Sequence, residues 1–251
     1  MKQINNYISE KLIINKDIKS THYNYHPKTR DELRNLVIDL IKERGNNANL
    51  NDIDTSEIIY MNDIFESTKF NGDISKWDVS NVKDMTRMFR GSGFNEDISN
   101  WDVSYVENMG SMFLSCTFNG DISEWNVSNV KDMDNMFGNS NFNKDISNWD
   151  VSNVKDMSGM FYNSKFNGDI SNWDVSKVEN MDEMFRSSEF TGENGDISKW
   201  DVSKVENMVK MFYNSKFNGN ISNWDVSNVK YMKNIFTKSP LEKNSPKWYK
   251  K

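Results

Sequence analysis

The stretch W-D-V-S-N-V-K-D-M-T-R-M-F-R-G-S-G-F-N-E-D-I-S, from Trp77 to Ser99, decides the fold because it begins again at Trp101 and keeps recurring. Tryptophan stands at positions 77, 101, 125, 149, 173, 200, 224 and 248, a step of 24 residues with a single step of 27. A fixed period in the range of about 20–50 residues is typical of a solenoid or a related array. The sequence therefore predicts a tandem-repeat protein whose units stack on one another.

Length and charge divide the chain into a body and two ends. We expect an N-terminal segment and capping helix at 1–49, eight repeats of 24–27 residues at 50–237, and a C-terminal cap at 238–251. The body carries 17 Lys and Arg against 30 Asp and Glu, whereas the two ends have net charges of +3 and +4. An acidic body argues against nucleic-acid binding, because phosphate backbones require a basic track.

The sequence gives no sign of membrane insertion. No apolar run approaches the roughly 18 residues that a membrane span needs. The N-terminal M-K-Q-I-N-N-Y-I-S-E-K lacks the hydrophobic region of a signal peptide, which predicts a cytoplasmic location. The single cysteine, Cys116, stands where Ser92 and Ser164 stand in other units, so packing is favoured over nucleophilic chemistry.

A capping helix is predicted ahead of the repeats. Thr29 and Glu32 form a capping box that satisfies free N–H groups of the first turn. Gly45 supplies the residue that ends the helix. Between them runs an amphipathic stripe that would cover the apolar end of the first unit: Leu33, Leu36, Val37, Leu40 and Ile41. Residues 1–28 would add a short helix or strand docked on the first repeat.

Each repeat is predicted to be a short helix followed by a short strand. Val82, Met85, Met88 and Phe89 recur at helical spacings, so we expect a helix over 81–90. In three units the helix begins at a full capping box: Ser104-x-x-Glu107, Ser176-x-x-Glu179 and Ser203-x-x-Glu206. The expected fold class is thus α/β, a right-handed solenoid of strand-plus-helix units with an N-terminal helical cap. The expected core comprises Trp77, Val79, Met85, Met88, Phe89, Phe94, Trp101, Trp125, Trp149, Trp173, Trp200 and Trp224.

The repeat resembles a known pattern. Ile74-x-x-Trp77-x-Val79 has the L-x-x-L-x-L spacing of leucine-rich repeats, with a period within their range. More closely, W-D-V-S-N-V-x-x-M-x-x-M-F with F-N-G-D-I-S resembles the repeat of bacterial BspA-type leucine-rich-repeat surface proteins. Leucine itself is nearly absent from the array, with Leu114 alone between 51 and 240. The resemblance implies adhesion or host-surface interaction, and a cell-surface or secreted location.

Two rows of aspartates are candidate binding groups. One row is Asp78, Asp102, Asp150, Asp174, Asp201 and Asp225, interrupted by Asn126; the other contains Asp73, Asp97, Asp121, Asp145, Asp169 and Asp196. Stacked units would place like charges about 5 Å apart, where they repel by roughly a kcal/mol or less in water. Backbone and hydroxyl donors would offset this repulsion. A divalent cation, a cationic partner or a glycan is the alternative.

A second candidate surface lies at the end of the expected helix. Positions there vary from unit to unit and include the basic and aromatic Arg90, Tyr162, Arg186 and Tyr213. The sequence shows no nucleophile–base pair and no phosphate-binding loop, and it has no histidine between 27 and 251. We therefore expect a non-enzymatic protein without cofactor or metal that binds a protein partner. Glycan or cation binding by the Asp, Ser and Asn rows is the alternative.

Overall fold

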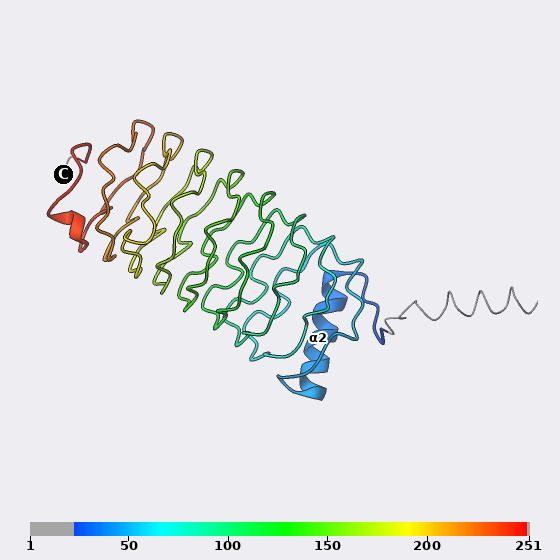
Figure 1. Cartoon of the computed structure of the whole chain (residues 1–251). Coiled ribbons are helices and arrows are strands. Elements are labelled where there is room, and N and C mark those ends of the chain that lie inside the picture. Colours follow the sequence, from blue (N-terminus) through cyan, green and yellow to red (C-terminus); the bar gives the residue numbers. More distant parts are fainter. Residues whose placement is uncertain (1–22, 250–251) are drawn as a thin grey trace, which may run out of the picture.

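The computed structural model describes residues 23–249; residues 1–22 and 250–251, and with them most of the segment expected to dock on the first repeat, lie outside the described part. Figure 1 shows successive coils stacked along one direction. Helix α2 (Arg30–Arg44) lies at one end, and the 3₁₀ helix η1 (Pro240–Glu242) lies near the other. No helix within 23–249 is both long and apolar enough to cross a membrane.

Helix α2 follows the sequence prediction. Thr29 Oγ1 accepts a hydrogen bond from the Glu32 N–H at 3.2 Å, and the Glu32 carboxylate accepts one from the Lys28 N–H at 2.7 Å. Gly45 follows the helix with a φ of 89°, in the left-handed range that favours glycine. The buried face of α2 belongs to the same continuous apolar core as the repeats and comprises Leu33, Val37 and Leu40.

The expected α/β architecture is wrong, because α2 and η1 are the regular elements of the described chain and the repeats contain neither helices nor strands. In place of the helix at 81–90, each unit makes consecutive tight turns. Met88 N–H bonds to the Met85 carbonyl three residues earlier at 3.1 Å. Arg87 and Gly91 have φ of 54° and 62°, a left-handed conformation found at the third position of type II turns.

The remaining N–H groups of these turns bond to the next unit. Arg87 N–H reaches the Gly110 carbonyl at 2.9 Å, and Phe89 N–H reaches the Met112 carbonyl at 3.0 Å. An α-helix would need bonds to carbonyls four residues back in the same unit. Residues three and four positions apart therefore face the same side although there is no helix. The reason is that consecutive turns, like a helix, direct these side chains toward the core.

The expected strand is also absent. Neighbouring units pair through single-residue parallel bridges, which run along one column of the stack. A strand needs several successive paired residues, and here the backbone turns away after one. The column comprises Tyr60, Asp84, Asn108, Asp132, Asp156, Asn180, Asn207 and Tyr231.

The core consists of columns of identical side chains. Phe89 stacks on Phe113 of the next unit with centroids 5.6 Å apart and an angle of 1° between the ring planes. The Trp101 indole N–H donates to the Ile74 carbonyl at 3.3 Å, and every other tryptophan makes the equivalent bond. The twelve core side chains named from the sequence are 0–5% exposed.

Candidate functional site

The two rows of aspartates close turns of their own backbone. Asp78 Oδ1 accepts hydrogen bonds from the Ser80 N–H at 3.0 Å and the Ser80 hydroxyl at 2.6 Å. This Asx turn is a standard use of Asp and Asn next to serine. Asn126 makes it with a neutral amide, so the turn does not need the charge. The N–H bond recurs at Asp102, Asp150, Asp174, Asp201 and Asp225, and in the other row at Asp73, Asp97, Asp121, Asp145, Asp169 and Asp196.

At some positions these hydrogen bonds favour the ionised carboxylate. The Ser176 hydroxyl, followed by its backbone N–H, lowers the pKa of Asp174, and Ser203 acts in the same way on Asp201. The backbone and hydroxyl donors expected from the sequence are therefore present along both rows. Within the described residues, no group of three or more His, Cys, Asp or Glu side chains is placed to hold a metal ion. The rows are acidic and exposed, but they do not converge on a common point.

A second surface is built from the tandem turns. We call it the turn face, formed by the exposed side chains of residues 84–93 and the equivalent segments of the other units. Arg186 lies between two tyrosines of the neighbouring units, with its Cζ 5.2 Å from the Tyr162 ring centroid and 5.6 Å from that of Tyr213. Its Nη1 is 2.7 Å from Glu183 Oε2, while Lys210 Nζ is 2.9 Å from Glu183 Oε1. The result is a preformed cluster of aromatic and charged groups.

The sequence-predicted residues of this face are only partly brought together. Arg186 contacts Tyr162 and Tyr213, whereas Arg90 lies three units before Tyr162 and pairs with Glu66 at 3.2 Å. In the two units between Arg90 and Tyr162, the equivalent positions hold Leu114 and Gly138. The unit next to Tyr162 therefore has no side chain at this position. Arg90 is thus on the same row but outside the cluster.

Polar atoms without partners gather on the turn face. Among residues 23–249, four buried side-chain atoms lack a hydrogen bond, and three of them belong to this face: Thr86 Oγ1, Asp182 Oδ1 and Arg186 Nε. Burial, with Glu183 contributing next, raises the pKa of Asp182. Nearly all buried polar groups in proteins are paired, so these atoms are exceptions to the usual pattern.

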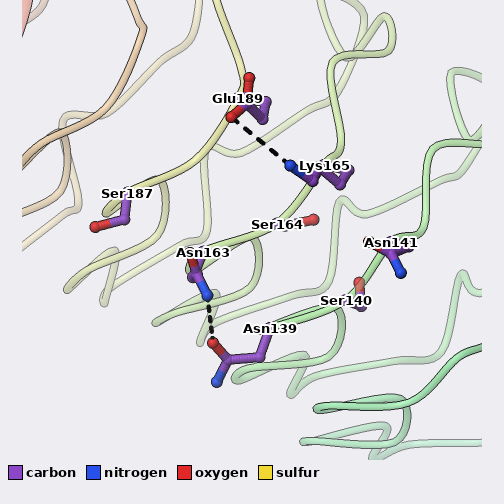
Figure 2. Close-up of a pocket in the computed structure, with 8 residues that line it drawn as sticks. All are labelled: Asn139, Ser140, Asn141, Asn163, Ser164, Lys165, Ser187 and Glu189. Atoms are coloured by element: carbon purple, nitrogen blue, oxygen red, sulfur yellow. Dashed lines mark hydrogen bonds and ion pairs between the residues drawn. The ribbon is translucent and has the colours of Figure 1, made fainter.

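A polar pocket of about 230 Å³ adjoins the cluster. Figure 2 shows Asn139 and Asn163 joined at one edge and Lys165 with Glu189 at the other. Asn163 Nδ2 donates to Asn139 Oδ1 at 2.8 Å, and Lys165 Nζ lies 4.0 Å from Glu189 Oε1. Ligand pockets usually exceed about 300 Å³ and are largely apolar. This pocket is therefore smaller and more polar than most ligand sites.

The pocket lacks the groups that covalent catalysis requires. Ser140 Oγ donates to the Phe137 carbonyl at 2.7 Å, not to a base. Cys116 is 3% exposed, and burial raises the pKa of its thiol to about 11. His26 lies at the N-terminal end of the stack, with Nδ1 3.2 Å from Asp54 Oδ2.

Sequence reasoning missed an exposed aromatic patch near the N-terminal end. Tyr105 is 64% exposed and stands in a row where asparagines normally cap a carbonyl of the preceding unit. Asn129 Nδ2, for example, donates to the Ser104 carbonyl at 2.7 Å. A groove of about 480 Å³ lies beside Tyr105 and includes Ile59. The signal was a tyrosine in an asparagine position, visible only when the units are compared column by column.

The fold and the turn face define a repeat protein whose units are joined by backbone hydrogen bonds and carry a row of variable side chains. The chain belongs to the family described as Mycoplasma protein of unknown function, DUF285, whose model matches residues 37–141, 92–192 and 138–248. The three overlapping matches reflect the tandem repetition. No curated protein and no solved structure matches the chain. The resemblance to BspA-type proteins stays a prediction.

Proposed function

We propose that the protein is a non-enzymatic binding protein that recognises a protein partner through the turn face. The observation that carries this proposal is the cluster of Arg186 between Tyr162 and Tyr213, part-exposed and already ordered before any partner arrives. Arginine and tyrosine are the residue types that contribute most binding energy at protein interfaces. A preformed arrangement also lowers the entropic cost of binding.

Variation among the units supports the same surface. At the row of Arg186 the units carry glutamate, arginine, leucine, glycine and tyrosine in turn, whereas the aspartate rows repeat almost unchanged. A constant row cannot single out one partner, but a variable row can. The polar pocket at Asn139 and Asn163 adds a hydrogen-bonding recess next to the cluster. The turn face therefore combines the Arg186 cluster, which can anchor a partner, with variable positions, which can distinguish one partner from another.

Glycan or cation binding by the aspartate rows is less favoured. One carboxylate oxygen of Asp78 is already occupied by two donors of Ser80, and the same turn is made by the uncharged Asn126. The geometry is thus explained by folding alone. If the resemblance to BspA-type proteins holds, the partner would be a protein met at a cell surface.

Photo-crosslinking tests the proposal. A benzoylphenylalanine placed at Tyr213 should capture a protein partner, and capture should be lost when Arg186→Glu is added. The matched control is Asp102→Asn with Asp174→Asn, which copies the natural Asn126 and should leave capture intact. Capture that survives Arg186→Glu but disappears in the aspartate control would refute the turn face as the binding surface.

A further inference from the structure

The two ends of the stack are closed to different degrees. At the N-terminal end, Tyr25 bridges Ile53, and α2 covers the apolar face. At the C-terminal end, η1 buries Leu241, and the Trp248 ring lies 5.7 Å from that of Phe236. These two side chains cover only the Phe236 half of the last unit. We call the other half, residues 226–234, the C-terminal edge.

The C-terminal edge presents unpaired backbone groups. In the unit before it, Met208 N–H bonds to the Tyr231 carbonyl at 2.7 Å and Lys210 N–H to the Lys233 carbonyl at 3.0 Å. The equivalent N–H groups of the last unit belong to Met232 and Asn234, and neither has a hydrogen-bond partner within residues 23–249. The Lys230 carbonyl is likewise unpaired there. The C-terminal edge therefore presents the same backbone donors and acceptor that join each interior unit to the next one, here without partners.

Apolar side chains of the core also reach the surface at this edge. Val226, Val229 and Met232 are partly exposed, whereas their equivalents one unit earlier are 0–1% exposed. Tyr231, beside them, is 62% exposed. A matching segment would have to bring apolar residues at the same V-x-x-V-x-x-M spacing, because that is what covers these positions inside the stack.

The charge of the C-terminal edge indicates what kind of segment could bind there. Two exposed lysines, Lys230 and Lys233, lie within the C-terminal edge, where Lys230 pairs with Glu206 at 2.7 Å, and three more exposed lysines follow it in the sequence: Lys238, Lys243 and Lys247. Within residues 225–249 there are two acidic residues, Asp225 and Glu242, against these five lysines. A second copy of the chain docked edge to edge would bring lysines against lysines, which disfavours that complex. An acidic segment would be attracted instead.

We propose that the C-terminal edge binds an acidic segment of a partner protein, which adds to the stack as the next unit would. Its carbonyls accept from the N–H groups of Met232 and Asn234, its N–H donates to the Lys230 carbonyl, and its apolar residues cover Val229 and Met232. This is backbone augmentation of an open edge, with side chains and charge giving the specificity. The edge shares no residue with the Arg186 cluster, so Arg186→Glu and the lysine variants of the edge test the two proposals separately.

A peptide with the chain's own repeat chemistry is the test ligand. Residues 101–124, with Cys116→Ser, contain Asp102, Glu107, Asp121 and Glu124 and no basic residue. Fluorescence anisotropy with the labelled peptide should show one peptide bound per full-length chain. Lys230→Glu with Lys233→Glu should weaken binding at least tenfold, whereas Lys131→Glu with Lys155→Glu, two interior positions in the row of Lys230, should not. Each variant is checked for an unchanged urea midpoint.

Three results would overturn the proposal. The first is no binding of the acidic peptide to the folded chain. The second is equal affinity for the edge variant and the interior variant. The third is a dimer in sedimentation equilibrium that Met232→Lys abolishes, because a second copy would then occupy the edge. A peptide of residues 224–247, which is basic, serves as the negative control.

Discussion

Replacing Asp132 by asparagine should stabilise the protein at neutral pH. Asp132 occupies the bridge column, where its Oδ1 accepts a hydrogen bond from the Asp134 N–H at 2.9 Å. Burial raises the pKa of its carboxyl to about 6, and the charges of Asp134 and Asp156 add to the effect. Asn108 makes the same bond, to the Gly110 N–H at 2.8 Å, without any charge. An amide therefore fits this column and removes the electrostatic cost.

The size and sign of the effect follow from proton linkage. A carboxyl with an ordinary pKa of 3.8 in the unfolded chain and about 6 in the folded one costs at most about 3 kcal/mol when ionised, and partial exposure reduces this to about 1–2 kcal/mol. The group is protonated in both states only well below pH 3.8, and at pH 4 only a small part of the cost is present. As pH rises from 4 to 6, the folded chain loses stability. Asp132→Asn should thus be more stable by about 1–2 kcal/mol at pH 7.5 and about equal at pH 4.

Urea unfolding monitored by tryptophan fluorescence at both pH values measures this difference. The matched control is Asp145→Asn, since the backbone N–H and then the hydroxyl of Ser147 lower the pKa of that exposed carboxyl. A lowered pKa contributes stability above the unfolded value, so the control should be slightly less stable at pH 7.5 and unchanged at low pH. The reasoning fails if Asp132→Asn is destabilised at pH 7.5, or if its advantage is the same at pH 4.

Three further changes probe the stack. Gly159→Ala should destabilise by about 1–2 kcal/mol in urea unfolding, because Gly159 has a φ of 59° and a Cβ would meet Asn135 Oδ1 at 2.2 Å; an unchanged midpoint would contradict this. Trp149→Phe should cost about 1–3 kcal/mol, because it removes the indole donor 3.0 Å from the Ile122 carbonyl, which keeps only the Trp125 N–H at 3.2 Å, and because the smaller ring leaves a void in the core; no loss of stability would argue against the indole ladder. Cys116 should react with a thiol reagent at pH 8 only after unfolding, since it is 3% exposed with a raised pKa; rapid reaction of the native chain would disprove its burial.

The length of the repeat and the positions of its buried apolar residues could be predicted from the sequence, because both depend only on which side chains must be buried. Trp77, Met85 and Phe89 recur at fixed positions, and any stacked unit must hide them. The helix α2 could also be predicted, since Thr29, Glu32 and Gly45 satisfy its ends through local bonds. These features need no knowledge of how one unit bonds to the next.

The local structure of the unit could not be predicted from spacing. Positions three and four apart face the same way in a helix and also in consecutive turns with left-handed residues. The apparent capping box at Ser104 misled for the same reason. Ser104 N–H bonds to Asp102 Oδ1 at 3.0 Å, and Glu107 N–H bonds to the Lys83 carbonyl of the previous unit at 2.8 Å. The competing bonds lie between units, and a single unit does not reveal them.

The candidate site was predicted in part. The contrast between constant aspartates and variable Arg186, Tyr162 and Tyr213 is visible in the sequence, but their mutual contacts are not. The repeated Asp-x-Ser could have been recognised as an Asx turn, which leaves no free carboxylate row to explain. The open C-terminal edge could not be foreseen, because it depends on which backbone groups the last unit leaves unpaired.

Acrylamide quenching of tryptophan fluorescence tests the central claim, that the repeats form one stack with their indoles inside it. Seven tryptophans are 3–5% exposed, and only Trp248 is partly exposed. The native chain should therefore show a small quenchable fraction, attributable to Trp248 and removed by Trp248→Phe, with full quenching only after unfolding. Native fluorescence quenched as strongly as free indole would contradict the stack.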